Sequence, residues 1–387
     1  MLIRNSKIYD HINRCFYDGD ILIKDGIIAA LGDVGDIADE EVFNAEGKRI
    51  VPGLIDVHTH GRVGSDFVLG ADADLCAMAR SYASHGVTTV MPTLASAPLE
   101  EMYSATEAIN AFVPRADEAS FCGVHLEGRY LNVAKRGAHA PEMLAPLDAG
   151  ELDAEPLRMC RALHISAAYE LDTDGSFAKK AREIGATLGL GHTTATFAEA
   201  KVAESRGVTA YTHLFNTMPS LHHRDGGAVC AAFDGDAYAE LICDGVHICE
   251  EMVRLAARVK GCERLVLISD SMEATGCPDG EYSIAGMPVT VKNGKAVTHD
   301  GALAGSMLTL DCAVRNLMSF ARMPLEEAIL CATVNPACEV GVFDTVGSIE
   351  VGKRADLLVL SDGDGFDIDR IVLRGELFGH LPTESEG

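Results

Sequence analysis

The chain has 387 residues, of which 48% are apolar and 23% charged, and its formal net charge at pH 7 is −26. This composition is typical of a globular protein and excludes extended disorder. The negative charge argues against a general nucleic-acid-binding or anionic-membrane-binding surface. An anionic ligand would therefore have to meet a local basic cluster.

The sequence shows no recognisable targeting signal or membrane span. The N-terminus, MLIRNSKIYD, lacks the apolar segment of a signal peptide, and no apolar run approaches the roughly 18 residues of a membrane span. The 12 cysteines are scattered without a C-x-x-C pair. We therefore expect reduced, mostly buried thiols in a cytoplasmic protein with no membrane or nucleic-acid partner.

Both ends of the chain are predicted to form short strands that cannot build a core alone. Lys24-Asp25-Gly26 is a hairpin turn signal within the N-terminal set. The strand-like stretches are residues 2–9, 20–31, 41–51, 347–360 and 371–375. The simplest interpretation is one small β-sandwich domain formed from both termini, residues 1–50 and 341–387.

The middle of the chain, residues 51–340, alternates strand candidates with helix-compatible segments. The eight strand candidates are 54–58, 87–92, 121–126, 162–168, 186–191, 208–213, 238–243 and 265–269. This rhythm predicts a parallel sheet, and eight units over this length predict an α/β fold with a closed (β/α)8 barrel. A glycine-rich, hairpin-like insertion at 276–303 would overhang the mouth as a lid or a substrate wall.

Residues 51–61, VPGLIDVHTHG, carry the first chemical signal. A turn at Pro52-Gly53 leads into an apolar strand that ends in His58 and His60. Residues two apart on a strand point to the same side, so these two imidazoles can share a metal ion.

Other predicted strands also end in polar residues, as catalytic strands of such barrels do. Glu127 ends the third strand, and His192, His213 and Asp270 end the fifth, sixth and eighth. His125 alternates with Leu126 and Glu127 on the third strand, and we interpret it as structural or as a support for the ligands.

Nitrogen and carboxylate ligands without thiolate suit divalent ions, with Zn²⁺ favoured and Fe²⁺, Mn²⁺, Co²⁺ or Ni²⁺ as alternatives. Glu127, His192 and His213 would form a three-ligand site that leaves a position for water. His58 and His60 can hold a second ion, with Glu127 or Asp270 between the two. Metal-activated water would be the nucleophile, and Asp270 would take its proton and pass it to a leaving amine. The pattern thus predicts metal-assisted hydrolysis with one or two ions.

Longer motifs resemble a known family. The first-strand pattern and the polar strand ends look like the amidohydrolase superfamily. Within it, the chain resembles the N-acetylglucosamine-6-phosphate deacetylases through HLEGRYLNVAKRGAH (125–139), GHTTATFAEA (191–200), THLFNTMPSLHHRDGG (212–227), ICDGVHI (242–248), SDSMEATGCPDGEY (269–282) and GALAGSMLTLDCAVRN (301–316).

The resemblance implies hydrolysis of the acetamide of a 2-acetamido-2-deoxyhexose 6-phosphate. It implies Glu127, His192 and His213 as ligands of the principal metal and Asp270 as general base and then acid. His139 would help to polarise the acetamide carbonyl. It also implies a homodimer, in which the loop carrying Arg224 reaches the neighbouring subunit. The implied substrate contacts are Ala138, His139, Asn216, Thr217, Arg224, His247, Leu303, Ala304 and Gly305.

Three departures from the family pattern bear on sugar identity rather than on metal binding. Arg129 replaces a proline and is expected to add positive charge close to the metal. Asp225-Gly226-Gly227 replaces Glu-Pro-Gly and loosens the loop that carries Arg224. Thr217 replaces alanine near the sugar.

Three alternatives remain. The sequence does not distinguish a deacetylase for the gluco sugar phosphate from one for its galacto epimer. A cyclic amidohydrolase of the dihydroorotase or hydantoinase type would need a lysine on the fourth strand, where this chain has ALHISAAYE. A barrel kept only for binding or as a scaffold would have lost ligands, and none is lost.

Overall fold

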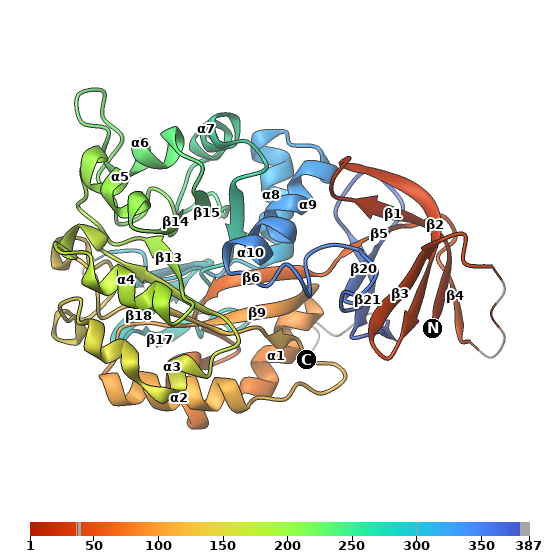
Figure 1. Ribbon diagram of the computed structural model, residues 1–387, viewed down its shortest axis with the longest axis horizontal. Coiled ribbons are helices and arrows are strands. Elements are labelled where there is room, and N and C mark those ends of the chain that lie inside the picture. Colours follow the sequence, from red (N-terminus) through yellow and green to blue (C-terminus); the bar gives the residue numbers. More distant parts are fainter. Residues whose placement is uncertain (36, 38–39, 300, 380–387) are drawn as a thin grey trace.

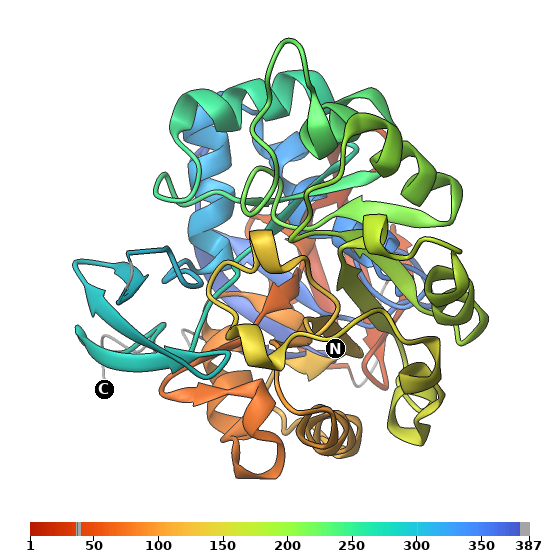
Figure 2. The ribbon, with the colours of Figure 1, turned by 90° about the vertical axis from the view of Figure 1, so that its left-hand side faces the viewer.

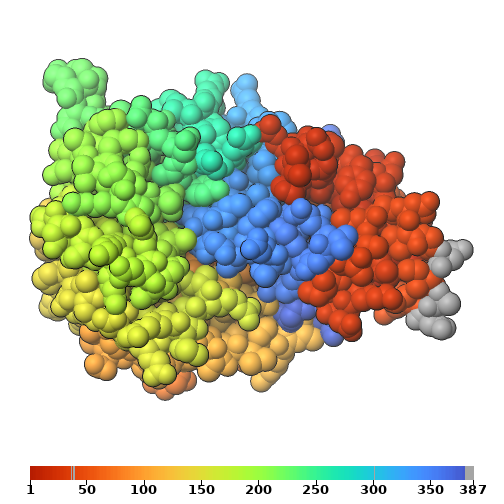
Figure 3. Space-filling model, viewed as in Figure 1, coloured from red at the N-terminus to blue at the C-terminus, as the bar shows by residue number. Residues whose placement is uncertain are grey.

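The computed structural model describes residues 1–35, 37, 40–299 and 301–379. It separates into a large barrel and a sheet at one end, built from the two chain termini (Figure 1). In the space-filling view the red N-terminal and blue C-terminal segments lie side by side at that end (Figure 3). Within the described residues, no helix is long and apolar enough to cross a membrane.

The eight predicted barrel strands are all present, in the predicted order. Neighbouring strands pair in parallel from β6 to β16, and the short β10 (Ser120–Phe121) adds to β9. The strands are β6 (Leu54–Thr59), β9 (Val87–Leu94), β11 (Val124–Glu127), β12 (Leu163–Ala167), β13 (Thr187–Leu190), β14 (Val208–Tyr211), β15 (Tyr238–Ile242) and β16 (Leu265–Ile268).

Hydrogen bonds just beyond β16 bring the last strand next to the first. The Asp270 N–H donates to the His58 carbonyl at 2.9 Å, and the His60 N–H donates to the Ser271 carbonyl at 2.8 Å. The predicted (β/α)8 barrel is confirmed. Its helices are α1 (Leu75–Ser84), α2 (Leu99–Ala111), α3 (Glu155–Arg158), α4 (Ser176–Glu183), α5 (Phe197–Ser205), α6 (Gly227–Asp234), α7 (Glu250–Lys260), α8 (Leu310–Ala321), α9 (Leu325–Ala332) and α10 (Val334–Glu339).

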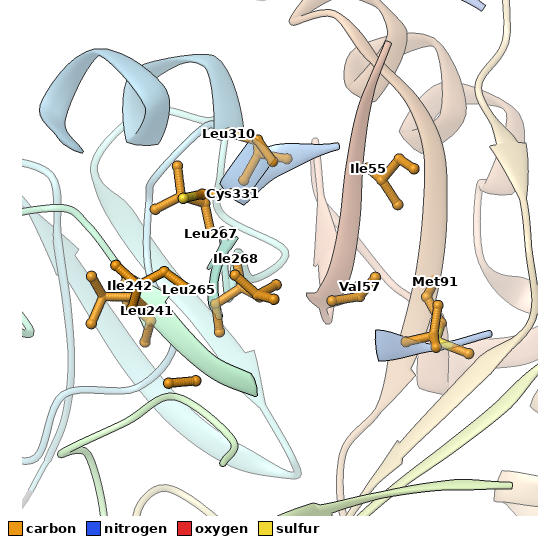
Figure 4. Packing of buried hydrophobic residues seen from close by; sticks show 14 of the residues in the cluster. Ile55, Val57, Met91, Leu241, Ile242, Leu265, Leu267, Ile268, Leu310 and Cys331 are labelled. Atoms are coloured by element: carbon orange, nitrogen blue, oxygen red, sulfur yellow. The ribbon is translucent and has the colours of Figure 1, made fainter. Parts of the chain in front are cut away.

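The two faces of β6 differ in polarity. Ile55 and Val57 belong to the main apolar cluster, in which Figure 4 shows them across from Leu267 and Ile268 of β16. They alternate with buried polar residues, Asp56 and His58 among them. Because alternate residues of a strand face opposite sides, helices α8, α9 and α10 can cover the apolar side while the polar side fills the barrel.

The terminal strands form one eight-stranded sheet with a buried cluster of its own. Residues Asp25 (φ 51°) and Gly26 (φ 75°) make the predicted hairpin turn with the left-handed backbone that such turns require. The strands are β1 (Leu2–Asp10), β2 (Cys15–Lys24), β3 (Ile27–Gly32), β4 (Val42–Asn44), β5 (Arg49–Pro52), β20 (Leu357–Leu360), β21 (Ile368–Leu373) and β22 (Glu376–Phe378).

The insertion after β16 is a three-stranded antiparallel sheet of β17 (Gly280–Ile284), β18 (Met287–Lys292) and β19 (Lys295–Thr298). Figure 2 looks at the barrel from the side opposite the terminal sheet and shows the insertion, in cyan, at one edge. A short β7 (Gly61–Arg62) and β8 (Ser65–Asp66) pair beside the end of β6. The sequence predicted the hairpin character of the insertion but not its third strand.

Candidate active site

The residues predicted as ligands all lie at or just beyond the carboxyl ends of barrel strands. His58 is within β6 and Glu127 ends β11, whereas His192, His213 and Asp270 each follow their strand by two residues. These last three have φ of 47°, 34° and 49°, a left-handed backbone that is sparsely populated for residues other than glycine. Such strain gathers at functional sites, where it aims side chains that an extended strand would carry elsewhere.

Glu127 is the centre of the cluster. Its Oε1 lies 2.8 Å from His213 Nε2, 3.1 Å from His192 Nε2 and 3.4 Å from His58 Nε2. Its Oε2 lies 3.0 Å from His60 Nε2. Four imidazoles from three strands therefore converge on one buried carboxylate.

Asp270 faces the same centre from the last strand. Its Oδ1 is 3.3 Å from His60 Nε2 and 3.7 Å from His58 Nε2. Two three-residue groups result, Glu127–His192–His213 and His58–His60–Asp270, and within each group the ligand atoms lie within 4.8 Å of one another.

The hydrogen-bonding pattern fits a cation between these groups. His192 Nδ1 lies 2.8 Å from the Lys135 carbonyl, which can only accept, so Nδ1 carries the proton and Nε2 is a lone pair. That lone pair faces His213 Nε2 at 3.0 Å and the Glu127 carboxylate. His58 Nδ1 bonds Glu240 at 2.9 Å, and its Nε2 has no hydrogen-bond partner. The His192 lone pair and the Glu127 carboxylate repel each other unless a cation lies between them, and the donor set suits a divalent ion.

Burial and neighbouring charge set the protonation of the cluster. Burial opposes charge on His60, but its hydrogen bonds with Asp270 and Glu127 raise its pKa to about 9. For His192, burial prevails and lowers the pKa to about 4, which keeps the ring in the neutral form that binds metal. Burial alone would raise the pKa of Asp270, but His60 and His58 hold it below its usual value, so the carboxylate is ionised.

A cavity of about 260 Å³ opens above the cluster. Ile284 and Ala285 of the insertion form part of its wall, as expected for a segment that overhangs the mouth. Of the predicted site residues, the following line it: His60, Glu127, Ala138, His139, His192, His213, Asn216, Thr217, His247, Asp270, Leu303 and Gly305.

Two lining histidines are held by neighbours that the sequence did not single out. His139 Nδ1 accepts from the Ser96 backbone N–H at 3.3 Å and lies 2.9 Å from the Ser96 hydroxyl. Its Nε2 therefore carries the proton, 3.7 Å from Glu127 Oε2. His247 Nδ1 lies 2.7 Å from Asp244 Oδ2; although burial opposes charge on the ring, this contact raises the pKa of His247.

Two predicted substrate contacts are not brought into this cavity. Ala304 is fully buried in the cluster beneath the insertion and does not line the cavity. Arg224 is exposed in the loop between β14 and α6, where its Nη1 lies 2.8 Å from His223 Nε2. This loop projects from the barrel at the upper left of Figure 1.

Arg129 does not point at the cluster as expected. Its guanidinium bonds Glu151 through Nη2 at 3.0 Å and Nε at 3.3 Å, and it does not line the cavity. Its φ of 59° is closed to proline, and its N–H donates to Ser96 Oγ at 3.0 Å. The departure from proline thus reflects a local backbone shape.

Sequence reasoning also missed Glu240, which is fully buried in β15 and holds His58. A carboxylate within the apolar strand YAELI is a visible signal of an inward-facing polar role. Ser96 had no comparable signal. His125, interpreted as structural, lies inside the barrel with its Nε2 2.7 Å from Ser166 Oγ.

Comparison with known proteins agrees with the fold and the cluster. Residues 49–378 match the model of the amidohydrolase family, a metal-dependent family. The chain belongs to the amidohydrolase family.

Within that family the chain is similar to sugar-phosphate deacetylases. It is 34% identical to an N-acetylgalactosamine-6-phosphate deacetylase of Escherichia coli O157:H7, over 93% of this chain and 94% of that one. It is 34% identical to an N-acetylglucosamine-6-phosphate deacetylase of Vibrio furnissii, over 85% and 82% of the two chains. The crystal structure of the Thermotoga maritima N-acetylglucosamine-6-phosphate deacetylase matches with a TM-score of 0.86 at 32% identity, over 98% of this chain and 100% of that one.

Proposed function

We propose that this chain is an N-acetylglucosamine-6-phosphate deacetylase, which hydrolyses the acetamide to glucosamine 6-phosphate and acetate in amino-sugar catabolism. The observation that carries the proposal is the convergence of four imidazoles on Glu127 beneath a cavity of about 260 Å³. Full-length similarity to deacetylases of this substrate class supports it.

Glu127, His192 and His213 would hold the principal ion, and His58, His60 and Asp270 a second one. Zn²⁺ suits these donors, with Fe²⁺, Mn²⁺, Co²⁺ and Ni²⁺ as alternatives. When bound, such an ion polarises a carbonyl oxygen and makes water acidic enough to attack at neutral pH.

Asp270 is the proposed proton carrier. It is ionised, lines the cavity and lies beside His60, so it can take a proton from the attacking water. As the water oxygen bonds to the acetyl carbon and the C–N bond breaks, the same carboxyl returns that proton to the departing nitrogen. The products are an amine and acetate.

His139 is the proposed partner of the acetyl oxygen. The Ser96 backbone N–H fixes its tautomer with the proton on Nε2, which points toward the cluster. An N–H held in that position can donate to the oxygen as negative charge develops on it.

The 6-phosphate of the proposed substrate requires a cationic side chain that this cavity does not itself supply. Among the described residues that line it there is no arginine or lysine. Besides His60 of the metal cluster, His247 is the lining histidine whose pKa is raised by a carboxylate. We place Arg224 at the phosphate of the neighbouring subunit in a homodimer, because its loop projects away from its own barrel.

The decisive test is acetate release from N-acetylglucosamine 6-phosphate by the purified protein, with metal content measured on the same sample. Unphosphorylated N-acetylglucosamine is the matched control. We expect turnover of the phosphate and poor turnover without it. A fully metallated protein that releases acetate from neither sugar would rule out the proposal.

The galacto epimer is the second candidate, because an N-acetylgalactosamine-6-phosphate deacetylase is as similar to this chain, at 34% identity, as a gluco enzyme. Comparing kcat/KM for the two epimers decides between them. A cyclic amidohydrolase is not favoured, since β12 (LHISA) carries no lysine for a bridging ligand.

A further inference from the structure

A second polar cluster is buried where α10 meets the barrel strands, and Glu240 links it to His58 and to the backbone of His213. It consists of His164 on β12, Glu240 on β15 and Glu339 at the end of α10. One ligand atom of each lies within 4.8 Å of the other two. The exposed fractions of the three residues are 0%, 0% and 2%.

Most of the polar atoms in this cluster have no hydrogen-bond partner. They are His164 Nε2, Glu240 Oε1, and Glu339 Oε1 and Oε2. Buried polar groups are normally paired, and buried carboxylates above all. All four unpartnered atoms belong to three residues whose ligand atoms lie close together, which indicates something that satisfies them jointly.

The remaining atoms of Glu240 and His164 fix what these two side chains offer. Glu240 Oε2 accepts from the backbone N–H of His213 at 3.1 Å and lies 2.9 Å from His58 Nδ1. His164 Nδ1 lies 2.8 Å from the Thr187 hydroxyl, so Nε2 is the ring nitrogen that is left without a partner.

The unpartnered atoms are therefore one imidazole nitrogen and three carboxyl oxygens. An imidazole nitrogen and carboxylate oxygens are the donors that divalent transition metals take, and the Thr187 hydroxyl holds the other ring nitrogen of His164 in place. Two carboxylates would balance the charge of one such ion. We propose that His164, Glu240 and Glu339 bind a structural divalent metal ion, such as Zn²⁺ or Mn²⁺, distinct from the ions of the mouth.

The competing occupant is a proton shared by the two carboxyl groups. Burial and the charge of Glu240 raise the pKa of Glu339, so a neutral Glu339 would also relieve the repulsion. A shared proton and a metal ion differ in one measurable quantity, the number of ions per chain.

The test counts metal by mass spectrometry in folded, desalted protein purified with Zn²⁺ or Mn²⁺. Four proteins are compared. They are the wild type, Glu339→Gln, a mouth variant in which His60, His192 and His213 are all changed to Asn, and a combined variant that carries all four substitutions. Glu118→Gln is the matched control, because Glu118 is also fully buried but is paired with Arg80 at 2.8 Å. Circular dichroism verifies folding, and His164→Asn replaces Glu339→Gln if the latter does not fold.

We expect Glu339→Gln to lose one equivalent of metal relative to both the wild type and Glu118→Gln. The mouth variant should keep one equivalent, and the combined variant should keep none. Equal metal content in the wild type and Glu339→Gln, or a mouth variant free of metal, would overturn the proposal in favour of the shared proton. No substrate enters the test, so its outcome is independent of the proposed deacetylase activity.

Discussion

The histidines at the mouth depend on hydrogen-bond partners behind them as well as on the groups that they face. Glu240 holds His58, the Lys135 carbonyl holds His192, and Ser96 holds His139. Each contact fixes which ring nitrogen carries the proton, and so which one is free to bind.

Asp270→Asn should keep the principal ion, which Glu127, His192 and His213 hold, and lose most turnover. The amide matches the carboxylate in size but cannot take up the proton, and general acid–base catalysis contributes about 10²–10⁴-fold. Steady-state kinetics with metal analysis of the same sample measures both quantities. Asp236→Asn, an exposed aspartate ahead of β15, is the control. Near-normal kcat in the Asp270 variant would remove this residue from the mechanism.

Arg129→Pro should destabilise the protein, even though the resemblance to the deacetylases implies proline at this position. The backbone here has a φ of 59°, which proline cannot adopt, and the N–H bonded to Ser96 would be lost. An incompatible proline costs more than about 1 kcal/mol of unfolding free energy. Arg129→Gly removes the Glu151 ion pair without the backbone conflict, so denaturant titration should find it more stable than Arg129→Pro. The reverse order would contradict the argument.

At the scale of elements, the parallel strands fix the position of the site, because their carboxyl ends meet at one rim. A buried carboxylate also links two of the helices. His85 at the end of α1 lies 3.3 Å from Asp311 at the start of α8, and Arg315 of α8 bonds the same carboxylate. This carboxylate therefore links two helices that are far apart in the sequence.

That link predicts an acid-sensitive contribution to stability. Burial would raise the pKa of Asp311, but His85 and Arg315 hold it well below its usual value of 3.8. The unfolded chain then binds this proton first as pH falls, so the stabilisation is complete above pH 3.8 and is lost below it. Chemical denaturation of the metal-free protein between about pH 6 and 3 should give a steeper loss for the wild type than for Asp311→Asn. Parallel profiles would show that the contact contributes nothing.

For the whole molecule, sequence patterns predicted the barrel and the polar residues at its strand ends, but not the residues that hold those side chains in place. Strand periodicity and polar strand ends were local signals, and the structure has His58, Glu127 and Asp270 at or just beyond the carboxyl ends of barrel strands, as predicted. The partners of Arg129 and of His164 were not predictable, because these contacts join segments that only the closed barrel brings together. The projecting position of Arg224 likewise depends on a loop without periodicity. Its role across a dimer interface stays a prediction, as do the domain boundaries.

Removing metal from the mouth should lower the stability of the entire barrel. Glu127, the four imidazoles around it and Asp270 come from β6, β11, β13, β14 and β16, so an ion bound there ties together strands from all around the sheet. A ligand that binds only the folded state stabilises it by about 4 kcal/mol at 1,000 times its Kd. Thermal unfolding with and without chelator should show a clear fall in Tm. The fall should be much smaller in a His192→Asn, His213→Asn variant, which lacks two of the principal ligands. A wild-type Tm that stays constant while measured metal content drops would mean that these residues do not hold an ion that couples to folding.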